Sequence, residues 1–122
     1  MNCSTIPLSI LATFVAVAGC GRPSCGNFEK NRLPSPDGEW VAVTFSRECG
    51  ATTARNVQVS LLKVGESLPD QPGQAFVADE GDVRISWSNS SHLQIDYGPN
   101  LRIYKKESQS RGVLIDYRQL SP

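Results

Sequence analysis

Apolar and polar side chains alternate along the second half of this 122-residue chain. In residues 83–87, Val, Ile and Trp alternate with Arg and Ser, and the same period of two recurs over 92–97, 101–104 and 113–118. Successive side chains of a β-strand point to opposite faces, whereas a helix repeats about every 3.6 residues. The pattern therefore predicts half-buried strands, each with one apolar face.

The first half of the chain shows the same alternation less strictly. Residues 39–47, 56–64 and 75–78 are predicted strands, and the first has apolar residues on both faces, so both are expected to be partly covered. The short links between these seven predicted strands favour antiparallel neighbours. We therefore predict an all-β domain over residues 35–122, a small antiparallel meander folded as a sandwich or a half-open barrel.

One turn signal is stronger than the others. In Ser35-Pro36-Asp37-Gly38, Pro presets φ, Asp can accept a hydrogen bond from nearby backbone, and Gly tolerates positive φ. Together with the strand after it, this stretch resembles the strand-opening turn of TolB-type β-propeller repeats, and residues 85–95 faintly repeat its shape. A propeller needs at least four blades of about forty residues. The resemblance therefore implies only a turn that leads into a strand.

The N-terminal segment has no charged side chain before residue 20. Its apolar run, residues 8–19, is too short for a membrane-spanning helix and suits the hydrophobic region of a signal peptide. The run ends in Val17-Ala18-Gly19-Cys20, which resembles the bacterial lipobox, although residues 1–9 carry no Lys or Arg. An uncleaved N-terminal helix and ordinary secretion are the alternatives.

The lipobox resemblance implies that residues 1–19 are a cleaved lipoprotein signal peptide and that Cys20 carries the lipid. Each buried CH₂ of an acyl chain contributes roughly 0.8 kcal/mol, so two or three chains hold a protein on a membrane. Because Gly21 is not Asp, the resemblance also implies sorting to an outer membrane of the cell envelope, facing the periplasm. Residues 20–34, which contain several Pro and Gly, are then expected to be a tether.

The four cysteines divide by location. Cys3 lies in the predicted signal peptide and Cys20 is the predicted lipidation site, which leaves Cys25 and Cys49 as a pair in an oxidising compartment. Such a pair predicts a disulfide, and closing a loop of about 25 residues stabilises a fold by roughly 3 kcal/mol. Two alternatives stay open. In the first, Cys49 is a nucleophile, which needs a base. In the second, both cysteines join His92 in a zinc site.

Four short motifs occur in order along the chain. They are Ser-Pro-Asp-Gly from residue 35, Cys-Gly-Ala-Thr-Thr from residue 49, Val-Ser-Leu-Leu from residue 59 and Phe-Val-Ala-Asp from residue 76. With the lipobox-like start they resemble a set of small, uncharacterised bacterial envelope proteins, over residues 20–118. The resemblance implies the same architecture and the same location, and it carries no catalytic residues.

The predicted binding loop joins the first two predicted strands, over residues 47–55. It combines charged groups, hydroxyl groups and a cysteine, as a rigid polar binding surface does. The residues expected to contribute are Arg47, Glu48, Thr52, Thr53 and Arg55. The alternative is a disulfide-pinned connection whose Thr hydroxyl groups cap its own backbone.

Twelve basic and twelve acidic side chains give a net charge of zero, which predicts no nucleic-acid binding. The signs are separated: three basic and seven acidic residues give −4 over 39–82, and five basic and two acidic residues give +3 over 101–118. The basic end, with Tyr104 among its charges, either orients the domain against an anionic lipid or polymer or is a solvated face. Its basic residues are Arg102, Lys105, Lys106, Arg111 and Arg118.

The acidic turn Asp79, Glu80 and Asp82 offers oxygen ligands for a divalent cation, but its spacing matches no calcium loop. We therefore predict no metal and no cofactor, and an exposed acidic turn is the simpler interpretation. No Ser, His and Asp order, glycine-rich phosphate loop or catalytic carboxylate pair stands out either.

These observations predict a non-enzymatic envelope lipoprotein whose β domain binds another envelope protein or a wall polymer. One alternative is a periplasmic inhibitor that inserts the loop around Cys49 into the active site of a hydrolase. A second alternative is an enzyme that uses Cys49 as its nucleophile.

Overall fold

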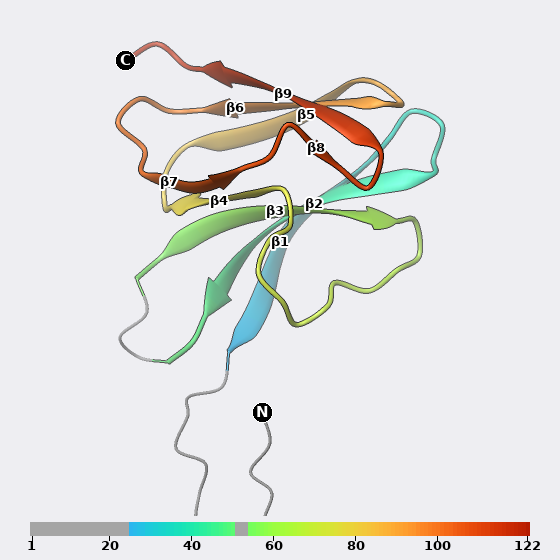
Figure 1. Ribbon diagram of the computed structural model, residues 1–122. Helices are drawn as coiled ribbons and strands as arrows, with labels where there is room; N and C mark the ends of the chain where they lie inside the picture. The colour runs from blue at the N-terminus through green and yellow to red at the C-terminus, as the bar shows by residue number, and fades with distance from the viewer. Residues whose placement is uncertain (1–24, 51–53) are drawn as a thin grey trace, which may run out of the picture.

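The computed structural model describes residues 25–50 and 54–122. These residues form nine β-strands in two sheets that lie one above the other (Figure 1). One sheet has five strands in the order β1-β2-β3-β4-β7, and the other has four in the order β5-β6-β9-β8. The predicted all-β class is confirmed, as a sandwich that is not closed into a barrel.

All seven predicted strands are present, with ends that differ by no more than two residues. Strands β1 and β8 are additional. The strands are β1 (Gly26–Pro34), β2 (Trp40–Glu48), β3 (Asn56–Lys63), β4 (Phe76–Asp79), β5 (Val83–Asn89), β6 (His92–Tyr97), β7 (Ile103–Lys106), β8 (Gln109–Ser110) and β9 (Val113–Gln119).

The segment 20–34, expected to be a tether, contains strand β1 instead. From Gly26 onward this strand pairs antiparallel with β2, with a bulge at Lys30. Sequence patterning missed β1 because it is an edge strand exposed on both faces and therefore shows no apolar alternation. Its bulge, its charged side chains and Pro34 are features that protect a sheet edge from pairing with another chain.

The predicted Ser-Pro-Asp-Gly turn is confirmed, and it joins β1 to β2 as a hairpin. The Gly38 N–H donates to the Ser35 carbonyl oxygen (2.9 Å), and Gly38 has a φ of +75°. The Asp37 carboxylate accepts hydrogen bonds from the Ser35 hydroxyl (2.7 Å) and the Glu39 N–H (3.1 Å). These bonds lower the pKa of Asp37 and hold the turn in shape.

One strand pair is parallel, which corrects the prediction of a purely antiparallel meander. Strands β6 and β9 run in the same direction, with His92 opposite Leu114 and Tyr97 opposite Gln119. Between them the chain crosses to the other sheet as β7 and returns as β8 (Figure 1). Each link is short, but the whole excursion supplies the crossover of about a dozen residues or more that parallel neighbours require.

The main core lies between the two sheets, and Phe76 is its largest fully buried side chain. A second apolar cluster lies on the outer face of the five-stranded sheet. There Val43, Phe45 and Leu62 are covered through Leu68 by the long loop between β3 and β4. Strand β2 is therefore buried on both faces, as predicted.

The loop between β3 and β4 is bound to the five-stranded sheet through one of its backbone N–H groups. The Gly73 N–H donates to the buried Gln58 Oε1 at 2.7 Å. A Cβ at Gly73 would lie 2.9 Å from the Phe76 carbonyl oxygen, so a larger residue would force the backbone to move. This loop is therefore an ordered cover over the outer face of the five-stranded sheet.

Candidate functional site

The predicted binding loop is supported at both ends by internal contacts. The Arg47 side chain is only 15 % exposed, and it pairs with Asp70 (2.8 Å) and donates to Asn27 Oδ1 (2.9 Å). At the other end of the loop, Arg55 lies 3.6 Å from Glu80. Arg47 therefore holds the loop between β3 and β4 against β1, and it is not a surface contact for a ligand.

The Asn56 side chain extends the pairing of β2 with β3 at the base of the same loop. Its amide accepts a hydrogen bond from the Arg47 N–H (2.9 Å) and donates one to the Arg47 carbonyl oxygen (2.7 Å). Glu48 is exposed, whereas Thr52 and Thr53 lie outside the described residues. Of the described members of the predicted site, Arg47 supports the fold, and Glu48 and Arg55 face solvent.

Cys25 and Cys49 form the predicted disulfide. Cys25 directly precedes Gly26 and Cys49 directly follows Glu48, and Gly26 and Glu48 are opposite each other, so the bond joins the ends of two paired strands. The bonded Cys49 sulfur is not a thiolate, and the His92 ring contacts a turn instead, with Nδ1 3.0 Å from an Asn side chain. In the described part of the chain no His, Cys, Asp or Glu side chains gather as a metal site requires.

The three carboxylates of the acidic turn face three different partners. Asp79 accepts a hydrogen bond from the Tyr104 hydroxyl (2.9 Å), and Glu80 has its ion pair at 3.6 Å. Asp82 accepts hydrogen bonds from both Nε and NH2 of Arg84, at 3.2 and 3.0 Å. These bonds raise the pKa of Arg84. The turn is therefore arranged as separate donor and acceptor pairs, not as the ligand set of one cation.

Several basic residues near the C-terminus are bound within the domain. Arg118 pairs with Asp96 (2.7 Å) across the parallel strands β9 and β6. Lys106 Nζ lies 5.3 and 5.1 Å from the ring centres of Tyr97 and Tyr117. These contacts place two of the predicted basic residues in the packing of the second sheet.

Two more of the basic residues contact the loop between β3 and β4. Lys105 Nζ donates to a carbonyl oxygen of the loop between β3 and β4 at 3.1 Å. Arg111 pairs with Glu66 (3.1 Å) and lies 5.2 Å from the Trp40 ring centre. Arg102 is exposed. The predicted basic surface is therefore largely a set of internal contacts that fasten the end of the chain.

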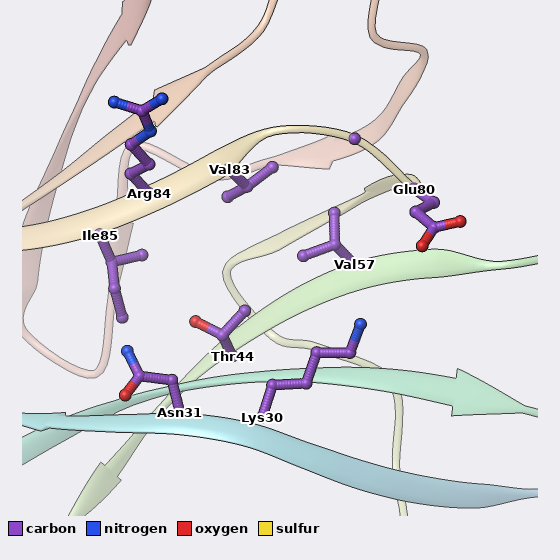
Figure 2. Close-up of a pocket in the computed structure, with 9 residues that line it drawn as sticks. Lys30, Asn31, Thr44, Val57, Glu80, Val83, Arg84 and Ile85 are labelled. Atoms are coloured by element: carbon purple, nitrogen blue, oxygen red, sulfur yellow. The ribbon is translucent and has the colours of Figure 1, made fainter.

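A groove of about 440 Å³ opens between the edges of the two sheets, where β1 and β5 face each other (Figure 2). Strands β1, β2 and β3 provide its floor, and β5 with the turn before it provides the opposite wall. Its apolar lining comes from Val57, Val83 and Ile85. Such a volume lies within the range of about 300–1,000 Å³ that is usual for ligand sites.

Three polar side chains on the floor of the groove have no partner among the described residues. Lys30 is the bulged residue of β1, and Asn31 lies opposite Thr44 in the register of β1 and β2. The Thr44 residue is only 9 % exposed. No buried side-chain polar atom of the described residues lacks a partner, so the Thr44 hydroxyl is reached from the groove. Water or a ligand must satisfy these groups.

The groove has one uncompensated charge among its described lining residues. Arg84 is bound by its neighbouring Asp, and Glu80 is paired with Arg55. Lys30 has no ion pair, and Figure 2 shows its side chain rising from β1 on the same side as Asn31 and Thr44. A ligand with a carboxylate would therefore complement the floor of the groove.

At one end of the groove, a hydrogen bond joins its two edge strands. The Trp87 Nε1–H donates to the Leu33 carbonyl oxygen (2.9 Å), which ties β5 to β1. Toward the start of β1, beyond the residues that line the groove, Phe28 is 56 % exposed. Phe28 and Asn31 are opposite alternate residues of β2, so they lie on the same face of the sheet.

Sequence reasoning missed the polar floor of this groove. Lys30 and Asn31 lie in the segment expected to be a tether, and the pairing of that segment could not be read from its polar composition. A weak signal existed in β2, where Thr44 and Ser46 follow Ala42 on the inward face. Polar residues on an otherwise apolar inward face indicate a part of the sheet that the second layer does not cover.

Comparison with family models, with curated proteins and with solved structures finds no match to this chain. Within residues 25–50 and 54–122 there is no helix long and apolar enough to cross a membrane. The fold and the site together define an open-edged β sandwich with a disulfide at its first hairpin and a groove between two edge strands.

Proposed function

We propose that this chain is a bacterial envelope lipoprotein, anchored through Cys20, whose β sandwich binds an envelope protein or a wall polymer in the groove between β1 and β5. The observation that carries the proposal is the disulfide that begins five residues after the lipobox-like cysteine. Disulfides persist in oxidising compartments such as the periplasm. The disulfide therefore supports the export that the N-terminal sequence predicts.

The short separation between Cys20 and Cys25 has a geometric consequence. Five residues span at most about 18 Å when fully extended. A lipid at Cys20 would therefore keep the Gly26 and Glu48 ends of β1 and β2 close to the membrane surface, on the periplasmic side of an outer membrane. The groove lies beside β1 and reaches the same end of the domain, because Glu80 in its lining pairs with Arg55 of the loop that follows Cys49.

The internal contacts of the loop around Cys49 favour the groove as the binding site. Among the described polar residues of this loop, Arg55 is paired with Glu80. Arg47 is also occupied by Asp70 and Asn27. The inhibitor hypothesis and the hypothesis of a Cys49 enzyme are therefore less well supported than a binding role for the groove.

Metabolic labelling with palmitate tests the anchor. The full chain, expressed in a bacterium, should incorporate label, and Cys20→Ala should abolish it. Cys3→Ala is the matched control, because it removes a cysteine from the predicted signal peptide and should leave labelling unchanged. An unlabelled wild-type protein, or label retained in Cys20→Ala, would overturn the proposed anchor.

A further inference from the structure

We propose that the ligand of the groove is an extended polypeptide segment with apolar and acidic side chains, which adds to the free edge of β5. This inference rests on the binding role proposed for the groove. It specifies the chemistry of the partner: backbone hydrogen bonds from β5, an apolar surface on the wall and one ammonium group on the floor.

Strand β5 presents a free backbone edge. Strand β5 is bonded on one side only, to β6, and their pairing is regular from Val83 to Trp87. The other backbone edge of a terminal strand presents unpaired N–H and C=O groups, which a further strand can bond. Strand β1, across the groove, is a poorer template, because the bulge at Lys30 interrupts it and Pro34 ends it.

The side chains of β5 alternate between the groove and the opposite side of the strand. Figure 2 shows Ile85 directed across the groove toward the floor, whereas Arg84 points to the other side of its strand. A polypeptide strand beside β5 would follow the same alternation, so that every second side chain would face Val57 and Thr44. The segment should therefore carry apolar residues at alternate positions.

The floor of the groove carries a positive charge. Lys30 is the charged lining residue that has no ion pair in the described chain, and Asn31 and Thr44 beside it also lack partners. An amide, a hydroxyl and an ammonium group together can hold a carboxylate. An acidic side chain on the inward face of the bound segment would satisfy these groups, whereas a basic side chain would be repelled.

A peptide titration of the full ¹⁵N-labelled chain in detergent tests the proposal. The probe is a capped nine-residue peptide of alternating Val and Thr that begins with Val and has Glu in place of the central Val, so that Glu and the Val residues share one face. It should shift the backbone amide signals of β5 and of Lys30. A peptide with Gln in place of Glu should bind about tenfold more weakly, because it loses one charge-assisted hydrogen bond. A peptide N-methylated on alternate residues should not bind.

Two variants of the protein sharpen the test. Lys30→Gln should remove the preference for the Glu peptide over the Gln peptide. Lys63→Gln is the matched control, because Lys63 is an exposed cation at the far end of β3, over the Trp40 ring. It should preserve the preference.

Several results would overturn the proposal. They are a Glu peptide that does not bind, equal affinity for the Glu and Gln peptides, undiminished binding of the N-methylated peptide, or signal changes confined to other strands. A dimer of the chain that forms through β5 without peptide would show a second copy to be the occupant. Peptide binding by a chain that takes no palmitate would leave this inference standing and overturn only the anchor.

Discussion

The two long sides of the sandwich are completed in different ways. On the closed side, the chain crosses between the sheets through β7 and β8. There the Glu107 N–H donates to the Ala75 carbonyl oxygen (3.0 Å), and the Tyr117 hydroxyl donates to the Glu107 carbonyl oxygen (2.6 Å). On the open side, β1 and β5 are both edge strands, and the Trp87 indole ties them near one end.

The difference shows how connectivity decides where a small β domain can bind. Aromatic rings fill the closed side, where Phe76 lies 6.3 and 6.0 Å from the ring centres of Tyr97 and Tyr117. Burial among these groups raises the pKa of Tyr117 well above its ordinary value. On the open side Asn31 and Thr44 meet no second layer. Where the chain crosses from one sheet to the other, it covers the edges of both sheets itself. Where no segment crosses, the edge strands remain available to a partner.

The same substitution on the two sides should have very different effects on stability. Phe76→Ala on the closed side should lower the free energy of unfolding by about 3–5 kcal/mol, because it leaves a cavity in the core. Phe28→Ala on the open side should change it by less than about 0.5 kcal/mol. Urea unfolding of both variants measures the difference. Equal losses would contradict the contrast between the sides.

The disulfide is the strongest fastening of the open side. Replacing both Cys25 and Cys49 with Ala should lower the free energy of unfolding by roughly 3 kcal/mol. The reason is that the unfolded chain regains the conformational entropy that the cross-link removes. Unfolding under non-reducing conditions measures this loss. Wild-type protein treated with a reductant should lose a similar amount, and stability that is insensitive to reductant would contradict the prediction.

The hydrogen bond that joins the two sheets on the open side should contribute less to the free energy of unfolding than the disulfide does. Trp87→Phe keeps an aromatic ring but removes the donor to the Leu33 carbonyl oxygen, so it should lower the free energy of unfolding by about 1 kcal/mol. Hydrogen exchange should then accelerate for β1 and β5 and stay unchanged for β7 and β9. Uniform acceleration over both sides would show that this bond does not fasten the open side in particular.

Acid should weaken the domain by a smaller amount. Burial raises the pKa of Asp96, but hydrogen bonds from Gln94 and Arg118 more than offset this effect, so the pKa of Asp96 is lowered overall. A carboxyl group whose pKa is lower in the folded chain stabilises the fold above its unfolded pKa of about 3.9, and this contribution is lost as pH falls further. Urea unfolding from neutral pH to about pH 3 should show the loss, and Asp96→Asn should reduce it.

The strands with apolar alternation were predictable, because burial on one face forces a period of two. Residues 83–87 and 92–95 show this directly in their burial. Strand β1 was not predictable in this way, because both of its faces are exposed and pairing with β2 is what makes it a strand. The parallel pairing of β6 with β9 was not predictable from the sequence either, for a related reason. Apolar periodicity reports which face is buried and not which neighbour lies beside a strand.

Part of the candidate site was also predictable from the sequence, and part was not. The pairing of Cys25 with Cys49 followed from counting cysteines once Cys3 and Cys20 were assigned, and the structure contains that disulfide. The polar loop from Arg47 looked like a binding surface because charged residues in a loop resemble one. The structure uses the Arg47 guanidinium to hold a distant loop instead, a contact over 23 residues that composition does not report.

The sequence by itself determined the all-β class, the Ser-Pro-Asp-Gly turn and the disulfide, because each depends on local periodicity, local backbone preference or the number of available cysteines. It also carries the lipobox-like signal on which the predicted anchor depends. Only the tertiary structure decided that β1 and β5 would face each other as free edges. Lys30, Asn31 and Thr44 become a site because strands far apart in the chain leave them uncovered, and that is a property of packing between layers.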